Sequence, residues 1–227
     1  MCFSATASFT SSAILTGAGI LALSRTRSAL ERPFAAIPLL FAAQQFAEGC
    51  LWLGLGSSHD AGVRASTYIF LFFAQILWPI WIPISMMYME TDLIRRRILL
   101  LLSGLGGSLS IYMAACLIIF GSRADIIGHH IFYTDAYPIQ FVALSGIAYG
   151  LTTILSPLVS GIRKMWILGI AIAAAYLFTS IFYGYYTTSV WCYCAAMLST
   201  VVVWILVTMN RPVTIANAPS AALVKQP

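Results

Sequence analysis

The stretch "LLFAAQQFAEGCLWLGL", residues 39–55, is almost entirely apolar, yet it contains two glutamines and a glutamate. It belongs to a longer apolar run, about 34–56, which has the roughly 17–25 residues that a helix needs to cross a bilayer. Polar side chains in such a run are costly unless they face a partner or a water-filled cavity. The stretch therefore predicts a membrane-spanning helix that carries a polar site on one face.

The composition of the whole chain agrees with a membrane protein. Of its 227 residues, 60% are hydrophobic and only 8% are charged. A soluble domain typically has about a quarter of its residues charged, so the bilayer is the expected solvent and partner. The net charge of +5 does not indicate nucleic-acid binding, because the basic residues stand singly or in short clusters between apolar runs.

Continuous hydrophobicity distinguishes this chain from a β-barrel, whose strands alternate polar and apolar residues. The predicted fold is an all-α integral membrane protein, a seven-transmembrane-helix bundle in a single domain over 1–209. Residues 210–227 are expected to be a disordered cytoplasmic tail. The predicted spans are about 7–24, 34–56, 66–89, 98–120, 137–158, 165–186 and 190–208.

The positions of the basic residues predict the orientation. Ten of the twelve Lys and Arg residues fall in the odd-numbered connections and the C-terminal tail. The positive-inside rule then places the N-terminus outside and the C-terminus in the cytoplasm, in a multi-pass protein of the inner (cytoplasmic) membrane. No cleaved signal peptide is predicted, because "MCFSATASF" has no charge and the arginines follow the first span.

Glu48 is the centre of the polar stripe in the second span. Gln44 and Gln45 precede it by four and three residues and therefore share its face of the helix; Trp52 continues the stripe by one turn. Glu48 lies eight residues from the expected outer end near Gly56, which corresponds to a depth of roughly 12 Å. This stripe is predicted to line a pocket that opens outward from the bundle interior.

Gln75 is a second polar side chain within an apolar run, "FFAQILWPIWIPISMM". Pro79 removes the backbone donor that would bond the carbonyl of residue 75, and Pro83 repeats this a turn later. Prolines in membrane helices usually kink the helix and free a carbonyl near protein or water. Gln75 is thus a candidate partner for Glu48 in the predicted pocket.

The reactive side chains gather on the predicted outer side. If the initiator methionine is removed, Cys2 offers an amine and a thiol on one residue, which can bind a metal or act as a nucleophile. Imidazole, thiolate and carboxylate suit zinc or copper, and the metal-ligand candidates are Cys2, Glu48, His129 and His130, with Asp135 as a further acid. The alternative is that Cys2 packs at the bundle mouth and the histidines belong to a hydrated surface loop.

Five cysteines on an oxidising side of the membrane also allow a disulfide. Cys50 could pair with Cys116, or Cys2 with a cysteine of the last span. Packing of free thiols inside the membrane is the alternative. The aromatic-rich end of the last two spans is interpreted as an interfacial belt, with a stacking platform for a ligand as the alternative.

Four segments together resemble a known family. "MCFSATASF", "QQFAEGCLWLGL", "FFAQILWPIWIPI" and "GHHIFY" are similar to an uncharacterised family of bacterial polytopic membrane proteins that opens with Met-Cys-Phe-Ser-Ala-x-Ala-Ser-Phe. The resemblance covers roughly the first five spans, and it departs at His130, where relatives often have a small polar residue. It implies that the shared residues are Cys2, Gln45, Glu48, Trp78, Pro79 and His129.

Several functions are excluded by the sequence. The lysines are Lys164 and Lys225, in a loop and the tail, so none can hold retinal inside the membrane, and there is no P-loop, GxSxG motif or arginine ladder. The first hypothesis is an outward-facing pocket that binds a metal or performs membrane-embedded chemistry, with Cys2, Glu48 and His129 as catalytic candidates. The alternative is a small-solute transporter or receptor with a small-molecule ligand, and an inert assembly partner ranks third.

Overall fold

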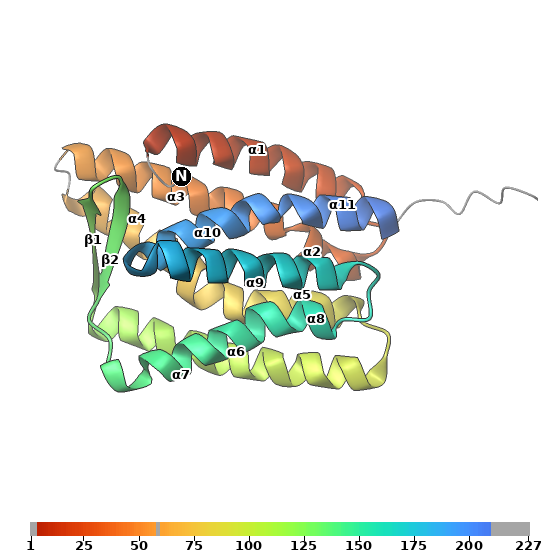
Figure 1. Cartoon of the computed structure of the whole chain (residues 1–227). Coiled ribbons are helices and arrows are strands. Elements are labelled where there is room, and N and C mark those ends of the chain that lie inside the picture. The colour runs from red at the N-terminus through yellow and green to blue at the C-terminus, as the bar shows by residue number, and fades with distance from the viewer. Residues whose placement is uncertain (1–3, 58–59, 210–227) are drawn as a thin grey trace, which may run out of the picture.

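In a computed structural model of the chain, which describes residues 4–57 and 60–209, long helices run side by side along one axis (Figure 1). Within these residues, seven helical segments are long and apolar enough to cross a membrane. The predicted all-α class with seven spans is therefore confirmed, and the predicted tail 210–227 lies outside the described residues. The segments are Ala5–Ser24, Ala29–Ser57, Asp60–Met89, Leu93–Ile119, Gln140–Val159, Met165–Phe182 and Thr188–Met209.

Most spans are composites of shorter helical elements, and one connection forms a β-hairpin. The hairpin consists of β1 (Ser122–Ile127) and β2 (His130–Asp135). The helical elements are α1 (Ala5–Ser24), η1 (Ala29–Glu31), α2 (Arg32–Ala35), α3 (Ile37–Ser57), α4 (Asp60–Leu71), η2 (Phe72–Leu77), α5 (Trp78–Met89), α6 (Leu93–Ile119), α7 (Ile139–Gly150), η3 (Leu151–Leu155), α8 (Ser156–Val159), α9 (Met165–Phe182), η4 (Gly184–Tyr186), α10 (Thr187–Leu198) and α11 (Thr200–Met209).

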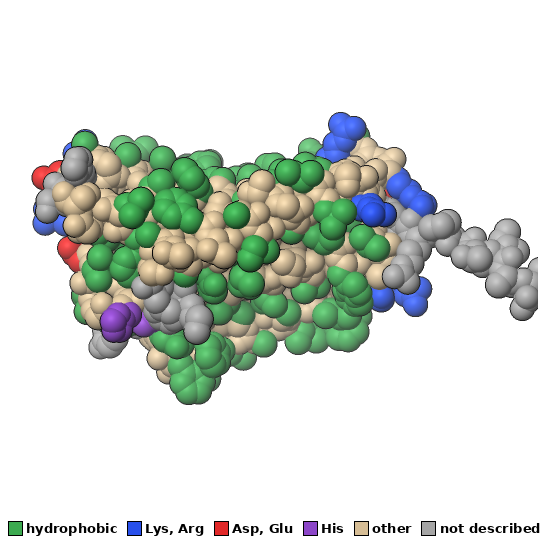
Figure 2. All heavy atoms as spheres, turned by 90° about the horizontal axis from the view of Figure 1, so that it is seen from above, with side chains coloured by type: hydrophobic (Ala, Val, Ile, Leu, Met, Phe, Trp, Pro, Cys, Tyr) green, Lys and Arg blue, Asp and Glu red, His purple; other side chains and the backbone are tan. Residues whose placement is uncertain are grey.

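The outer surface of the bundle is apolar, as a lipid-facing surface must be. Large aliphatic side chains project outward, among them Leu101, Ile118 and Ile181, which are 74%, 79% and 74% exposed. Figure 2 shows hydrophobic side chains along the length of the bundle, with charged side chains at its two ends. Most of the Lys and Arg side chains in this view lie at the end where α11 finishes, opposite the hairpin.

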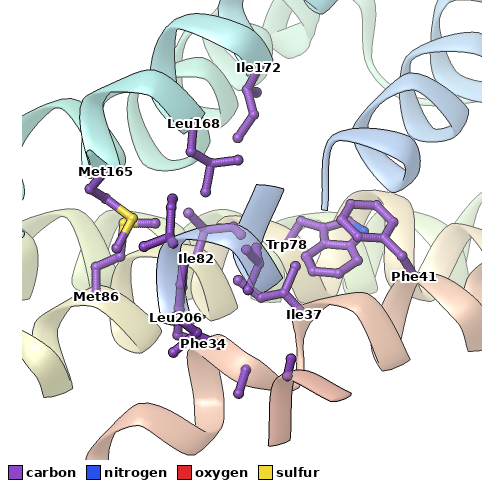
Figure 3. Packing of buried hydrophobic residues seen from close by; sticks show 14 of the residues in the cluster. Phe34, Ile37, Phe41, Trp78, Ile82, Met86, Met165, Leu168, Ile172 and Leu206 are labelled. Carbon is purple, nitrogen blue, oxygen red and sulfur yellow. The ribbon is translucent and has the colours of Figure 1, made fainter. Parts of the chain in front are cut away.

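The interior is a continuous core of aromatic and aliphatic side chains. The rings of Phe41 on α3 and Trp78 on α5 stack with centroids 3.9 Å apart. Figure 3 shows them beside Ile37, with Ile82 and Leu206 extending the core toward α11. This cluster joins the early helices to the last two spans and fixes where α3 and α5 face each other.

Two π-helical segments interrupt the spans just before a proline. η2 ends two residues before Pro79, and η3 ends two residues before Pro157. Proline lacks an N–H, so nearby carbonyls lose a partner within the helix. Side chains of other helices bond two carbonyls of η2. The carbonyl oxygen of Ala74 accepts a hydrogen bond of 2.6 Å from the Tyr149 hydroxyl, and that of Ile76 accepts one of 2.6 Å from the Ser110 hydroxyl.

The hairpin was not predicted from the sequence. Its two-residue turn places Gly128, with a φ of 63°, at the first central position, where primed hairpin turns require positive φ. Ala124 and Ile131 are buried together with Leu51 of α3, and the Tyr133 ring stacks on that of Phe70 at 5.0 Å. The hairpin thus covers the ends of α3 and α4; we call this end of the bundle the hairpin end.

We predict that Gly106→Ala destabilises the protein by about 1–3 kcal/mol, a typical cost of overpacking a filled interior. A Cβ atom on Gly106 of α6 would overlap the carbonyl oxygen of Pro79 on α5. The overlapping atom belongs to the backbone, so the overlap cannot be relieved by turning a flexible side chain. Small residues let membrane helices approach this closely. Thermal unfolding of the purified protein in detergent measures the effect.

Gly104→Ala is the matched control, because no atom lies within 4 Å of a Cβ built there. Replacing a glycine in the middle of a helix should stabilise it by about 0.5–1 kcal/mol. Equal effects of the two substitutions would contradict the close packing of α5 on α6.

Candidate functional site

Glu48 lies inside the bundle on the same face of α3 as Gln44 and Gln45, and all three side chains have 0% exposure. The Ser189 hydroxyl of α10 donates a hydrogen bond of 2.6 Å to Glu48 Oε1. Gln44 Oε1 accepts a hydrogen bond of 2.8 Å from the indole nitrogen of Trp78 on α5. The polar side chains of α3 therefore face other helices and not the lipid.

Helix α1 brings a further hydroxyl to this region. Ser12 Oγ donates to the carbonyl oxygen of Ala42 at 2.8 Å, and the Phe9 ring lies against Gly49. These contacts show that α1 and α3 run antiparallel, so Ser8, one turn before Ser12, is level with the segment 45–49. Ser8 is fully buried and joins what we call the Glu48 cluster, formed by Ser8, Gln44, Gln45, Glu48 and Ser189.

Several buried atoms of the Glu48 cluster have no hydrogen-bond partner among the described residues. They are Ser8 Oγ, Gln44 Nε2, Gln45 Oε1, Gln45 Nε2 and Glu48 Oε2, with Trp52 Nε1 one turn further along α3. Buried polar groups in proteins are nearly always hydrogen-bonded to protein or to water. A concentration of such atoms marks a place that accommodates water, a proton or a small polar ligand.

Glu90 shows how the same fold satisfies a buried carboxylate. It lies between α5 and α6 and is only 7% exposed. Both of its oxygens are bonded, by backbone N–H groups and a hydroxyl at 2.7–3.3 Å, from Thr91, Asp92, Ser160 and Gly161. Among the described residues, Ser189 is the one donor of full hydrogen-bond geometry to Glu48, with the Gln45 amide beside it, so the two carboxyl groups differ in how well a negative charge is stabilised.

A cavity of about 500 Å³ lies at the hairpin end, between β2 and the helices α6, α7, α9 and α10. Asp135 is the charged side chain among its described lining residues, and the rest of the wall is mostly aromatic and aliphatic. We call it the hairpin cavity. Its size is that of a typical small-molecule site, which is roughly 300–1,000 Å³.

Gln75 belongs to the hairpin cavity and not to the Glu48 cluster, so its predicted partnership with Glu48 is wrong. Gln75 Nε2 donates to Asp135 Oδ2 at 2.8 Å, and the Tyr137 hydroxyl donates to Gln75 Oε1 at 2.6 Å. The second oxygen of Asp135 accepts from the Ser122 hydroxyl at 2.7 Å. The hairpin supplies these partners, which sequence spacing along the helices could not indicate.

Burial and charge set the protonation state of Tyr137, which lies beside Asp135. Burial, followed by the negative charge of Asp135, raises the pKa of Tyr137 well above its usual value. The tyrosine is therefore a neutral hydroxyl that can donate a hydrogen bond. Asp135 accepts hydrogen bonds from two donors and is the acidic side chain among the described lining residues of the hairpin cavity.

Aromatic side chains form the deeper wall of the hairpin cavity. The Trp191 ring contacts those of Tyr149 and Tyr176 edge-on, with centroids 5.2 Å and 5.1 Å away. Tyr149, Trp191 and Cys192 also line a smaller apolar cavity of about 40 Å³, whose wall includes Trp78. Part of the aromatic segment interpreted from the sequence as an interfacial belt therefore lines a cavity. The spacing of these aromatic residues along the helix could not distinguish an interfacial position from a cavity wall.

The predicted metal site is not assembled from the described candidates. His129 lies exposed at the turn of the hairpin, His130 stacks on Tyr186 with ring centroids 4.6 Å apart, and Glu48 is inside the bundle. Burial is the main reason that the pKa of His130 is lowered, so its imidazole is neutral. Within the described residues, no three His, Cys, Asp or Glu side chains come together around a metal position. Cys2 lies outside the described residues.

The described cysteines are thiols, which contradicts a Cys50–Cys116 disulfide. Cys50, Cys116, Cys192 and Cys194 are all free. Cys192 is buried in an apolar cluster that includes Phe70 and Leu117, and Cys116 is buried as well. These four cysteines agree with the alternative hypothesis, that free thiols pack inside the membrane.

Comparison with known proteins gives one match. A family model described as "Family of unknown function (DUF6629)" matches residues 1–218. No curated protein and no solved structure matches the chain. The match agrees with the resemblance to an uncharacterised family and covers the whole helical bundle.

We predict that Glu48→Gln leaves the thermal stability of the purified protein unchanged, whereas Glu90→Gln lowers it by about 1–3 kcal/mol. An amide at position 48 retains an acceptor for Ser189 and adds a donor where unbonded acceptors already exist. An amide at position 90 turns an NH₂ group toward donors that now bond a carboxylate, which leaves buried donors unsatisfied.

Both variants are compared by thermal unfolding in the same detergent. A loss of stability in Glu48→Gln as large as that in Glu90→Gln would mean that Glu48 is held as a charged group by a structural partner.

Proposed function

We propose that this chain, which belongs to DUF6629, a family of unknown function, binds a small organic cation in the hairpin cavity. The observation that carries the proposal is the cavity's composition: a carboxylate held at one side, an aromatic wall at the other, and no Lys or Arg among the described lining residues. The predicted outward-facing pocket is thereby assigned to the hairpin cavity and not to the α3 stripe.

The aromatic wall favours a cation over a neutral or anionic solute. Trp191 and Tyr149 present ring faces or edges at fixed angles because they pack against each other. A cation within about 6 Å of such a ring gains about 0.5–2 kcal/mol, depending on how far water is excluded. Quaternary ammonium groups are recognised in this way, and an anion would meet the charge of Asp135.

Transport or reception is the use of the pocket that we favour over metal binding or chemistry. Zinc or copper held by Cys2, Glu48, His129 and His130 draws no support from the three described members, which do not come together as one group. The two π-helical segments border the cavity through Gln75 and Ile154. Such segments are frequent at functional sites and allow a helix to change its local geometry.

The orientation that we propose places the hairpin end outside the cytoplasm, with the protein in the inner membrane. The basic residues that cluster at the opposite end support this orientation through the positive-inside rule. In a variant whose five natural cysteines are replaced by serine, Asp125→Cys should react in intact cells with a maleimide that cannot cross the membrane. A cysteine at Ala29 should react only after the membrane is permeabilised, and the reverse pattern would overturn the orientation.

We predict that choline binds the purified protein and that 3,3-dimethylbutan-1-ol, its neutral isostere with carbon in place of nitrogen, binds at least tenfold more weakly. The reason is that both fill the same space, but only choline has the charge that Asp135 and the aromatic rings attract. Calorimetry in a detergent of fixed concentration measures both affinities.

Asp135→Asn keeps the shape of the side chain and should weaken choline binding roughly tenfold, which corresponds to about 1.4 kcal/mol. Asp125→Asn is the matched control, because Asp125 lies on the exposed face of the same hairpin. Equal binding of choline and its isostere would refute recognition of a cation.

A further inference from the structure

The Glu48 cluster is separate from the residues that the proposed cation site uses. Glu48 is completely buried, and its Oε2 atom has no hydrogen-bond partner among the described residues. Among the described residues, neither the oxygen nor the nitrogen of the Gln45 amide has a partner of full hydrogen-bond geometry, although this amide lies beside the Glu48 carboxyl group, and Ser8 Oγ on α1 has none. Buried atoms of this kind are unusual, and here they lie on the Glu48 face of α3 and at the same level of α1.

The described surroundings of Glu48 contain no positive charge. On α3 the nearest titratable side chain is that of Cys50, and on α10 they are those of Cys192, Tyr193 and Cys194. The described part of α1 contributes hydroxyl groups to this face, and α5 contributes the indole of Trp78 through Gln44. None of these groups can neutralise a carboxylate.

The unbonded atoms are a mixture of donors and acceptors. Glu48 Oε2 and Gln45 Oε1 accept, the amide nitrogens of Gln44 and Gln45 donate, and Ser8 can do either. A metal cation would be repelled by the amide donors. A carboxylic acid suits the set, because its O–H donates to an acceptor while its other oxygen accepts from Ser189.

We propose that Glu48 is a proton-binding site: its side chain is a neutral carboxylic acid in this arrangement and releases the proton when water reaches the Glu48 cluster. An ionised carboxylate without a partner inside the membrane is expensive, and acidic residues at such positions commonly take up and release protons. Glu90 provides the contrast, since four donors bond its two oxygens at the opposite end of the bundle.

Helix α10 connects this site to the hairpin cavity. Ser189 bonds Glu48, while its neighbour Thr188 and, one turn on, Trp191 and Cys192 line the cavity. This connection rests on the proposed function. Loss of the proton adds a negative charge near the cavity, so an organic cation should bind more tightly as pH rises, and a bound cation should in turn favour proton release.

Infrared spectroscopy of the purified protein in lipid nanodiscs tests the proton site without any ligand. The carbonyl-stretch band of a protonated carboxylic acid is expected at neutral pH, where exposed carboxyl groups are ionised. The band should be absent from Glu48→Gln and retained in Glu90→Gln. In Ser189→Ala it should move to higher frequency, because a hydrogen bond to the carbonyl oxygen is lost.

Three results would overturn the proton site. One is the lack of such a band at neutral pH in the natural sequence, and another is a band unchanged in Glu48→Gln. The third is a band that disappears when potassium is replaced by sodium at constant pH, which would identify sodium as the ligand. If Glu48→Gln does not fold, the frequency shift in Ser189→Ala remains an independent reading.

The connection is tested by choline binding at pH values on both sides of the midpoint of the infrared band. In the natural sequence the affinity should increase several-fold from the lower to the higher pH. In Glu48→Gln the affinity should stay at the low-pH level. Asp135→Asn should bind choline weakly but keep the increase, because the increase arises from Glu48, whereas Asp135 lines the cavity itself.

The two proposals fail in different ways. A pH dependence that survives in Glu48→Gln would refute the connection through α10. Failure of choline to bind at any pH would refute the proposed function and with it the connection, whereas the infrared result would still decide whether Glu48 holds a proton.

Discussion

Inside a bilayer no water is available to bond a polar group, and this constraint explains most of the polar contacts in the structure. Carbonyls in the π-helical segment before Pro79 are bonded by the hydroxyls of Tyr149 and Ser110 from other helices. Buried serines and threonines bond carbonyls one turn back in their own helix, as Ser103 and Thr179 do. Where the constraint is met, the helices are fixed in position, because each such bond requires a particular pair of neighbours.

The Glu48 cluster departs from this pattern, and that departure is the reason to regard it as functional. A membrane protein that needs only stability has no use for a carboxyl group that meets one donor, and Glu90 shows that this fold can supply four. The hairpin cavity departs in another way, since it leaves a volume of about 500 Å³ unfilled. Because α10 borders both places, a change in charge at one can alter binding at the other without a large movement of the helices.

The candidate residues differ in how far the sequence could place them. Gln44, Gln45 and Glu48 share a helical face, and their polarity in an apolar span is sufficient to predict that this face points inward, where they are found. Gln75 has the same polarity, yet its partners Asp135 and Tyr137 lie 60 and 62 residues away along the chain. Such partners depend on how the hairpin folds back over the bundle. His129 and His130 likewise lie at one end of the bundle, but an end of the bundle is much larger than a metal site.

The sequence by itself determined the solvent, the number of spans and the inward face of each polar stripe. These properties follow from local hydrophobicity and from the period of the helix, which need no knowledge of other segments. Only the tertiary structure decided that Gln75 bonds Asp135, that the four described cysteines are unpaired thiols, and that Trp191 lines a cavity. These facts depend on which helices become neighbours, and within a membrane hydrophobicity does not choose among neighbours, because lipid and helix surfaces are equally apolar.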